Sequence, residues 1–319
     1  MANDHLHAQY GYQPRDPSRF TRRCRLLQSW YRVEVARQSE CGPWRPGASA
    51  VGSSLADGQV TGANFISPIA FAYAKERIAD KRHNPDLTID EHRLFNNMLS
   101  SQPMCFNLFA DLRAGLQAGW PNATDVLAAM FAESGIDTVA SVEVEMIPHP
   151  TSDYIDDKTA FDALVLFTGR DGRNGIAAIE TKYTDKLGGN VASRQDRKFA
   201  LVDELDLFTA EGRAWYAERG FDQITRNLLL TLAFARRHTI DNAINFVLGP
   251  ADDQDTPALV DELSARLAPQ YRDRLLWLPL EKAVERGLSV PCSYYADHLR
   301  RFHRRYLDFS QIQHLISHA

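Results

Sequence analysis

Two carboxylates and a lysine lie at the ends of two apolar segments, where they could bind a cation. Asp162 begins the segment Phe161–Phe167, and Glu180 and Lys182 lie near the end of the segment Ile176–Tyr183. β-Branched and aromatic residues separated by a turn rich in Gly, Asn and Asp predict two antiparallel strands. The start of the first strand and the end of the second are neighbours in such a hairpin, so the three side chains are expected to converge.

The second segment is apolar on both faces of the expected strand, so charged side chains at its end are unexpected. Burying two acids is costly unless a cation lies between them. Mg²⁺ suits this arrangement because it prefers oxygen ligands and is usually held by one or two carboxylates plus water. Lys182 shares a face with Glu180 and could orient an attacking water or stabilise charge developing on phosphorus. The alternative is an exposed hairpin with solvated charges.

The spacing D-x17-E-x-K on paired strands resembles the PD-(D/E)XK nuclease superfamily, which has the restriction-endonuclease-like fold. By this resemblance Asp162 and Glu180 bind Mg²⁺, or alternatively Mn²⁺, and Lys182 is the catalytic lysine. The resemblance also implies that the carbonyl oxygen of Thr181 adds a metal ligand. The proline of the motif's name is absent, since Phe161 precedes Asp162.

A third carboxylate is expected from the segment Val139–Ile147, whose residues alternate between an apolar and a polar face and therefore predict a strand. Many members of the superfamily carry an extra upstream acid near the metal. Glu145 is the preferred candidate because it lies nearer the end of the strand than Glu143 does. A solvated edge face is the alternative interpretation.

The stretch Leu99–Phe109 (LSSQPMCFNLF) strengthens the resemblance. It is similar to a branch of restriction endonucleases in which an SSQP-x-x-FN-L-F-like stretch precedes the catalytic strands, and the likeness runs over most of the chain. It implies metal-dependent hydrolysis of DNA phosphodiester bonds, by an endonuclease rather than an exonuclease. Two alternatives are a catalytically inactive nucleic-acid-binding module of the same fold and a glycosidase with paired acids, which would have little use for Lys182.

Two predicted helices carry candidate contacts to nucleic acid. Ser18–Gln38 has one apolar stripe and several arginines on its remaining positions, among them Arg22 and Arg23, whose guanidinium groups suit phosphate geometry. A solvated basic face is the alternative.

Phe221–His238 has a buried stripe and a polar first turn. Superfamily enzymes place such a helix beside the site, so Gln223 is expected to assist catalysis and Arg226 to contact nucleic acid. An amphipathic helix with a solvated side is the alternative. The loop Lys186–Phe199 lies next to the site in sequence and could touch substrate.

The pattern as a whole predicts an α/β protein with a mixed four- to five-stranded sheet and helices on both faces. Residues 1–90 are expected to form an N-terminal helical and loop extension packed on a nuclease-like core of residues 91–319. The first fifteen residues are expected to be a mobile tail, Cys41–Gly62 a loop, and Asp203–Arg219 one helix. The expected strands are Val139–Ile147, Phe161–Phe167, Ile176–Tyr183, Asn242–Gly249 and Leu275–Leu280.

The composition limits the surfaces, the compartment and the partners that we expect. The 319 residues are 44% hydrophobic and 24% charged, with a formal net charge of −5, so any nucleic-acid surface must be a local basic groove. Four widely spaced cysteines without a C-x-x-C pair fit a reducing cytoplasm. No apolar run approaches the roughly 20 residues that span a bilayer, so no membrane partner is expected. Because many enzymes that cut both strands act as dimers, a homodimer is also expected.

Overall fold

The computed structural model describes residues 2–84, 86–185 and 196–316. Its centre is a five-stranded sheet in the order β3-β4-β5-β6-β7. The first three strands of this sheet are antiparallel, and β5, β6 and β7 run parallel. The mixed α/β fold predicted from the sequence is therefore confirmed. The strands are β3 (Ile136–Met146), β4 (Phe161–Gly169), β5 (Asn174–Thr181), β6 (Asn242–Gly249) and β7 (Leu275–Pro279).

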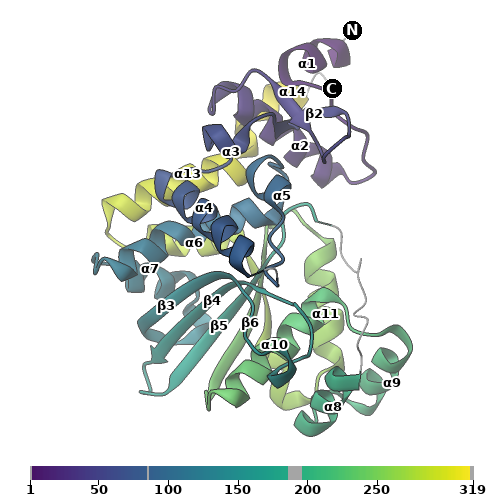
Figure 1. Cartoon of the computed structure of the whole chain (residues 1–319), viewed down its shortest axis with the longest axis vertical. Helices are drawn as coiled ribbons and strands as arrows, with labels where there is room; N and C mark the ends of the chain where they lie inside the picture. Colours follow the sequence, from purple (N-terminus) through teal and green to yellow (C-terminus); the bar gives the residue numbers. More distant parts are fainter. Residues whose placement is uncertain (1, 85, 186–195, 317–319) are drawn as a thin grey trace.

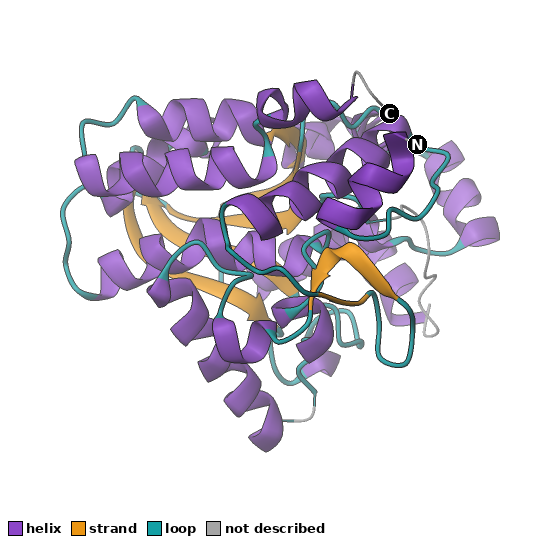
Figure 2. Ribbon diagram, turned by 90° about the horizontal axis from the view of Figure 1, so that it is seen from above, coloured by secondary structure: helices purple, strands orange, loops and turns teal. Residues whose placement is uncertain are grey.

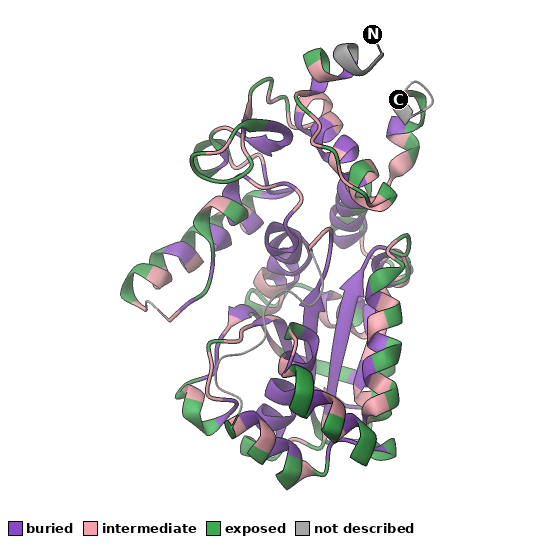
Figure 3. Ribbon diagram, turned by 90° about the vertical axis from the view of Figure 1, so that its right-hand side faces the viewer, coloured by how far each residue is buried: buried purple, intermediate pink, exposed green. Residues whose placement is uncertain are grey.

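The hairpin of β4 and β5 is buried on both faces, as its continuous apolar runs predict. Leu164 and Ala178 face one apolar cluster, whereas Val165 and Ile179 face another on the opposite side. Figure 3 shows the buried strands inside helices whose outer surfaces are exposed. The charged ends of β4 and β5 therefore lie at the edge of a dry sheet.

Helices cover both faces of the sheet (Figures 1 and 2). One layer packs on the cluster that contains Val165, and the other on the cluster that contains Leu164. The first layer consists of α4 (Pro68–His83), α6 (Ser101–Gln117), α7 (Ala123–Met130), α12 (Leu280–Leu288) and α13 (Ser293–Tyr306). The second consists of α8 (Asp196–Leu205), α9 (Ala210–Arg219), α10 (Gln223–Arg237) and α11 (Asp255–Arg266).

The N-terminal part differs from the expectation of a mobile tail and a long loop. It contains two helices, a small antiparallel hairpin and one short turn of helix before α4: α1 (Ala2–Tyr10), α2 (Arg19–Glu34), β1 (Cys41–Pro43), β2 (Ala50–Leu55) and α3 (Gly58–Thr61). The reason is the buried Arg32, whose guanidinium donates to the carbonyl oxygens of Gly52 (2.8 Å) and Tyr10 (3.1 Å). Gly52 permits this closeness, because a Cβ there would lie 2.3 Å from the Tyr10 oxygen.

The expected helix Asp203–Arg219 is also divided. α8 ends at Leu205, and α9 begins after Thr209, whose side chain accepts a hydrogen bond from the N–H of Gly212. Between them Phe208 is buried and pairs with Leu267 in an isolated β-bridge. Burying this aromatic side chain stabilises the fold more than continuing the helix through Phe208 would.

The remaining elements are short. They are α5 (Glu91–Phe95), α14 (Gln313–Ile316) and four 3₁₀ helices at Ala132–Ser134, Thr151–Asp153, Pro269–Arg274 and Phe309–Ile312. Residues before and after position 90 share one apolar cluster, which supports our proposal that the N-terminal 90 residues are an extension of the core. In the part of the chain that the structure describes, no helix has the length and apolar character needed to cross a membrane.

Candidate active site

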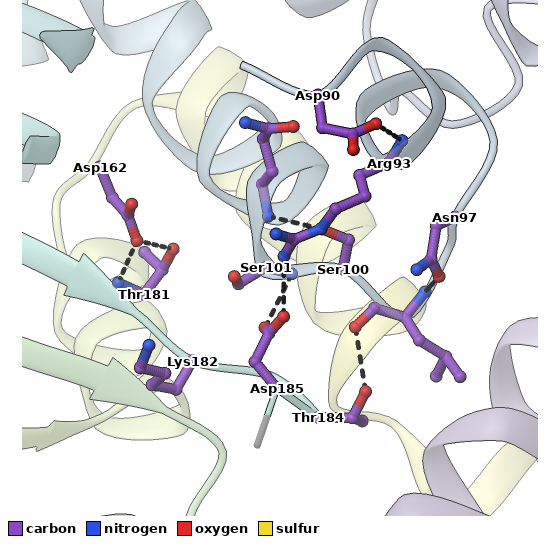
Figure 4. Close-up of polar contacts among 12 residues, drawn as sticks. Asp90, Arg93, Asn97, Ser100, Ser101, Asp162, Thr181, Lys182, Thr184 and Asp185 are labelled. Carbon is purple, nitrogen blue, oxygen red and sulfur yellow. Dashed lines mark hydrogen bonds and ion pairs between the residues drawn. The ribbon is translucent and has the colours of Figure 1, made fainter. Parts of the chain in front are cut away.

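The carboxylate of Asp162 is held where β4 and β5 separate. The last residue pair in the ladder between these strands joins Ala163 to Ile179. Beyond it, Asp162 Oδ2 accepts hydrogen bonds from Thr181 N (2.7 Å) and from Thr181 Oγ1 (2.8 Å), as Figure 4 shows. The carboxylate of Asp162 thus accepts the hydrogen bond that Thr181 N would otherwise donate to a main-chain oxygen. Asp162 is less buried than Glu180 and Lys182 as a residue, although its carboxylate is largely desolvated.

Glu180 and Lys182 are buried at the end of β5, with exposed fractions of 1% and 4%. Lys182 Nζ lies 2.6 Å from Glu180 Oε1 and donates to Gln223 Oε1 at 2.8 Å. Asn227 Nδ2 donates to Glu180 Oε2. Gln223 and Asn227 are four residues apart on α10, so the first turns of this helix place two amides on the charged pair.

Glu145 belongs to the same group of acids. It lies next to the last residue of β3, is 6% exposed, and has a left-handed backbone with φ of 54°. Val144 packs on the α6 side of the sheet and Met146 on the α10 side, so the strand's alternation is interrupted at Glu145. Its Oε1 accepts a hydrogen bond from Gln102 Nε2 at 2.8 Å.

The stretch that contains Gln102 links the helical layer to the catalytic strands. Ser100 caps α6 by accepting from the N–H of Gln102, and the N–H of Ser101 donates to Asp185 Oδ2 at 3.2 Å. Cys105 Sγ donates to the carbonyl oxygen of Asp162 at 3.2 Å. Arg93 Nη2 lies 2.9 Å from Asp185 Oδ1, so both oxygens of Asp185 are engaged (Figure 4).

The pKa values of the three acids in the site are raised, so their ionisation is disfavoured. Burial raises the pKa of Glu180 to about 8, repulsion from Asp162 adds to this, and Lys182 opposes it. Burial and repulsion from Asp162 raise the pKa of Glu145 to about 7. Loss of solvation raises the pKa of Asp162, although Lys182 and the Thr181 N–H oppose it. For Lys182 burial acts against the charge, but Glu180 and Asp162 raise its pKa overall. Lys182 therefore offsets Asp162 and Glu180, whereas Arg93 and Arg77 lower the pKa of Glu145.

The donor set fits a hard divalent cation in its chemistry. Glu180 Oε1 is buried with Lys182 Nζ 2.6 Å away as its partner, and Asp162 Oδ1 accepts no hydrogen bond from the described residues. These carboxylate oxygens are of the kind that Mg²⁺ prefers. Over residues 2–84, 86–185 and 196–316, however, no three His, Cys, Asp or Glu side chains are arranged as a ready-made metal cage.

The three arginines predicted to contact nucleic acid lie outside this group. Arg22 and Arg23 are on α2, where Arg23 pairs with Asp252 at 2.5 Å. Arg226 is on α10, and its Nε lies 4.0 Å from Asp157 Oδ2. The expected substrate loop after Asp185 falls largely on residues 186–195, which lie outside the described residues.

Sequence reasoning missed four residues that contact the acids and the lysine strand: Gln102, Asn227, Arg93 and Asp185. Helical periodicity places Asn227 on the same polar face of the predicted helix as Gln223 and Arg226, but no site role was assigned to it from the sequence. Gln102 is part of the SSQP stretch, but nothing in the sequence pairs that stretch with Glu145. Arg93 and Asp185 lie 92 residues apart, and only the fold brings them together.

A mixed sheet whose central hairpin carries an acid on each strand, with a lysine two residues beyond the second acid, defines a restriction-endonuclease-like protein. The family model described as the PD-(D/E)XK nuclease superfamily matches residues 14–308. The chain belongs to this superfamily, as its motifs indicated. Comparison with curated proteins and with solved structures gives no significant match. Members of the superfamily are generally phosphodiesterase nucleases that use divalent metals.

Proposed function

We propose that the chain is a metal-dependent nuclease that hydrolyses phosphodiester bonds in DNA and acts as an endonuclease. The observation that carries the proposal is the convergence of Asp162, Glu180 and Lys182 where β4 begins and β5 ends. Burying a lysine beside acids costs desolvation free energy, and a catalytic use would explain why these charges are kept in the fold. Family membership supports a nucleic-acid substrate.

Asp162 and Glu180 would hold Mg²⁺ or Mn²⁺, with Glu145 and the carbonyl oxygen of Thr181 as further ligands. When bound, the ion supplies a water of lowered pKa and positive charge beside the scissile phosphate. The hydroxyl and N–H of Thr181 fix the orientation of Asp162. Gln102 fixes Glu145 in the same manner.

Lys182 would stabilise the negative charge that grows on the phosphate during attack. Its charge is assured because Glu180 and Asp162 raise its pKa. Gln223 accepts a hydrogen bond from Lys182 Nζ and would direct the ammonium group, so we assign it a positioning role in catalysis. Asn227 would do the same for Glu180.

Arg22 and Arg23 on α2 and Arg226 on α10 are the proposed contacts to DNA phosphates. Arg23 and Arg226 each lie beside a carboxylate, Asp252 and Asp157, so a phosphate would replace the acid as the partner of the guanidinium. Two chains with one candidate site each could cut both strands together, and we propose a homodimer on DNA. Analytical ultracentrifugation with and without duplex DNA tests that state.

The test of the function is cleavage of supercoiled plasmid, linear DNA and RNA with Mg²⁺ or Mn²⁺. Cutting of the closed circle indicates an endonuclease, whereas cutting of linear DNA alone indicates an exonuclease. Lys182→Ala should abolish cleavage, and Lys282→Ala, at an exposed lysine of α12, should leave it unchanged. Absence of both cleavage and metal binding in the wild type would favour an inactive binding module instead.

A further inference from the structure

A pocket of about 920 Å³ lies between α1 and the first turns of α2 and is lined by none of the acids of the candidate active site. The described residues that line it include no acidic side chain. This concentration of positive charge occurs in a chain whose formal net charge is −5. The arginines that line the pocket are Arg15, Arg19, Arg22, Arg23 and Arg25.

Three of these charges have no acidic partner among the described residues. Arg15 and Arg19 are exposed and make no hydrogen bond or ion pair with the described part of the chain. Arg22 Nη1 donates to the carbonyl oxygens of Asp16 (2.5 Å) and Pro17 (3.1 Å), which orient the guanidinium without neutralising it. The pocket is therefore suited to a ligand with several negative charges.

The wall of the pocket is held in place by hydrogen bonds to α2. Arg25 Nη1 donates to the carbonyl oxygen of Pro14 at 2.5 Å, and Gln13 Nε2 donates to Ser29 Oγ at 2.9 Å. The buried Arg32 fixes the end of α1 through the carbonyl oxygen of Tyr10. Because these contacts form within the chain, the backbone that carries the arginines is fixed before any ligand binds.

An aromatic face lies among the arginines. Tyr12 is 52% exposed, and its ring meets the edge of His7 with a centroid distance of 5.5 Å. Proteins bind single strands through basic groups that contact the phosphates and aromatic rings on which the bases stack. This pocket has both. We propose that this pocket binds a single-stranded segment of the nucleic-acid substrate, with phosphates on Arg15, Arg19 and Arg22 and a base on Tyr12. The proposal rests on the proposed nuclease function.

The same helix supports the candidate active site. Gln28 of α2 donates through Nε2 to the hydroxyl of Tyr183, the residue after Lys182, at 3.1 Å. Arg19 and Arg23 also line a second pocket that reaches the segment after Lys182. Arg23 is paired with Asp252, one of the acids that line this second pocket: Asp16, Asp185, Asp252, Asp253 and Asp255.

The experiment measures fluorescence anisotropy of a labelled single-stranded oligonucleotide without metal, in the Lys182→Ala background so that no cleavage occurs. The triple variant Arg15→Ala, Arg19→Ala, Arg22→Ala should bind at least tenfold more weakly. Its slope of log K against log salt should fall by about 2, at roughly 0.7 for each lost phosphate contact. The matched control is a triple of exposed arginines elsewhere on the fold, Arg82→Ala, Arg170→Ala, Arg272→Ala.

Tyr12→Ala is the second variant, because it removes no charge. It should weaken binding of the single strand by about fivefold or more, by loss of one stacked base, and leave duplex binding unchanged. Equal binding by the pocket triple and the control triple would overturn the proposal. Equal affinity for a mononucleotide and for the oligonucleotide would also overturn it, since the pocket would then be a small-ligand site.

The outcome is separable from that of the nuclease proposal. If wild-type protein cleaves DNA and the pocket triple, made with Lys182 intact, binds and cuts as the wild type does, the pocket proposal and the phosphate contact assigned to Arg22 fail while the nuclease proposal stands. If wild-type protein cleaves nothing while the triple loses binding, the nuclease proposal fails and the pocket stands. Melting temperatures of all variants verify that they fold, and Arg25 and Arg32 stay unchanged to preserve the wall.

Discussion

Lys182 Nζ donates a hydrogen bond to Gln223 Oε1 across 2.8 Å, joining the end of β5 to the first turn of α10. The two residues are 41 positions apart, and Lys182 also lies 2.6 Å from Glu180. Gln223 and Glu180 thus hold the ammonium group between them. The helix after the lysine strand is part of the site for this reason.

Gln223→Ala should lower the cleavage rate while leaving DNA affinity unchanged. A hydrogen bond to a charged group contributes about 1.5–3 kcal/mol, so loss of this bond in the transition state corresponds to a rate loss of roughly ten- to hundredfold. Single-turnover cleavage at saturating protein measures it. Gln117→Ala, at the exposed end of α6, is the control. An unchanged rate would remove Gln223 from the positioning of Lys182.

Asn227→Ala should weaken metal binding. Without the amide of Asn227, the buried Glu180 Oε2 loses its hydrogen bond. Removing a residue that supports a metal ligand in this way typically lowers metal affinity by roughly ten- to a hundredfold. Mn²⁺ titration by calorimetry measures the change. Asn245→Ala removes another buried amide, which donates to Thr231 of the same helix, and should cost stability without changing Mn²⁺ affinity. Similar affinities in the two variants would contradict the assignment.

Thr181→Val should weaken metal binding by about tenfold, because the hydroxyl that orients Asp162 is lost while the main-chain N–H and carbonyl remain. Thr181→Ser keeps the hydroxyl and should restore most of the affinity. Both variants keep the main-chain carbonyl that we propose as a metal ligand. Comparing them therefore measures the effect of the hydroxyl alone. Wild-type affinity in Thr181→Val would show that the hydroxyl does not orient Asp162 for metal binding.

Stability of the metal-free chain should fall as pH rises from about 5 to 8. Glu180 and Glu145 ordinarily titrate at 4.5, but in the fold their pKa values are about 8 and about 7. The folded state therefore binds more protons than the unfolded state between these values, and raising the pH through this window favours unfolding. Thermal melting in EDTA measures the slope, and Mg²⁺ should raise the melting temperature more at pH 8 than at pH 6.

Glu145→Gln isolates part of that pH dependence. The amide keeps an oxygen for Gln102 Nε2 but removes a buried charge beside Asp162. The variant should melt at a higher temperature than the wild type at pH 8 in EDTA, with little difference at pH 5. Loss of Mn²⁺ affinity in the same variant would support Glu145 as a ligand. A melting temperature lower than that of the wild type at pH 8 would contradict the raised pKa.

The sequence alone was sufficient for the elements whose signals are local. Alternating or continuous apolar runs predicted all five strands of the central sheet, and the turn between β4 and β5 followed from its glycines. The spacing of Asp162, Glu180 and Lys182 sufficed because hairpin pairing is itself local. Periodicity also predicted α10, including the face that carries Gln223.

Tertiary structure decided what depends on contacts between distant segments. The tail and loop expected before residue 62 are ordered because Arg32 collects carbonyl oxygens from α1 and β2, which no local pattern reveals. Asp203–Arg219 is broken because Phe208 gains more by burial than by helical continuity. Likewise, Gln102 meets Glu145 across 43 positions. Such pairings depend on how whole layers pack, and propensity and periodicity carry no information about that packing.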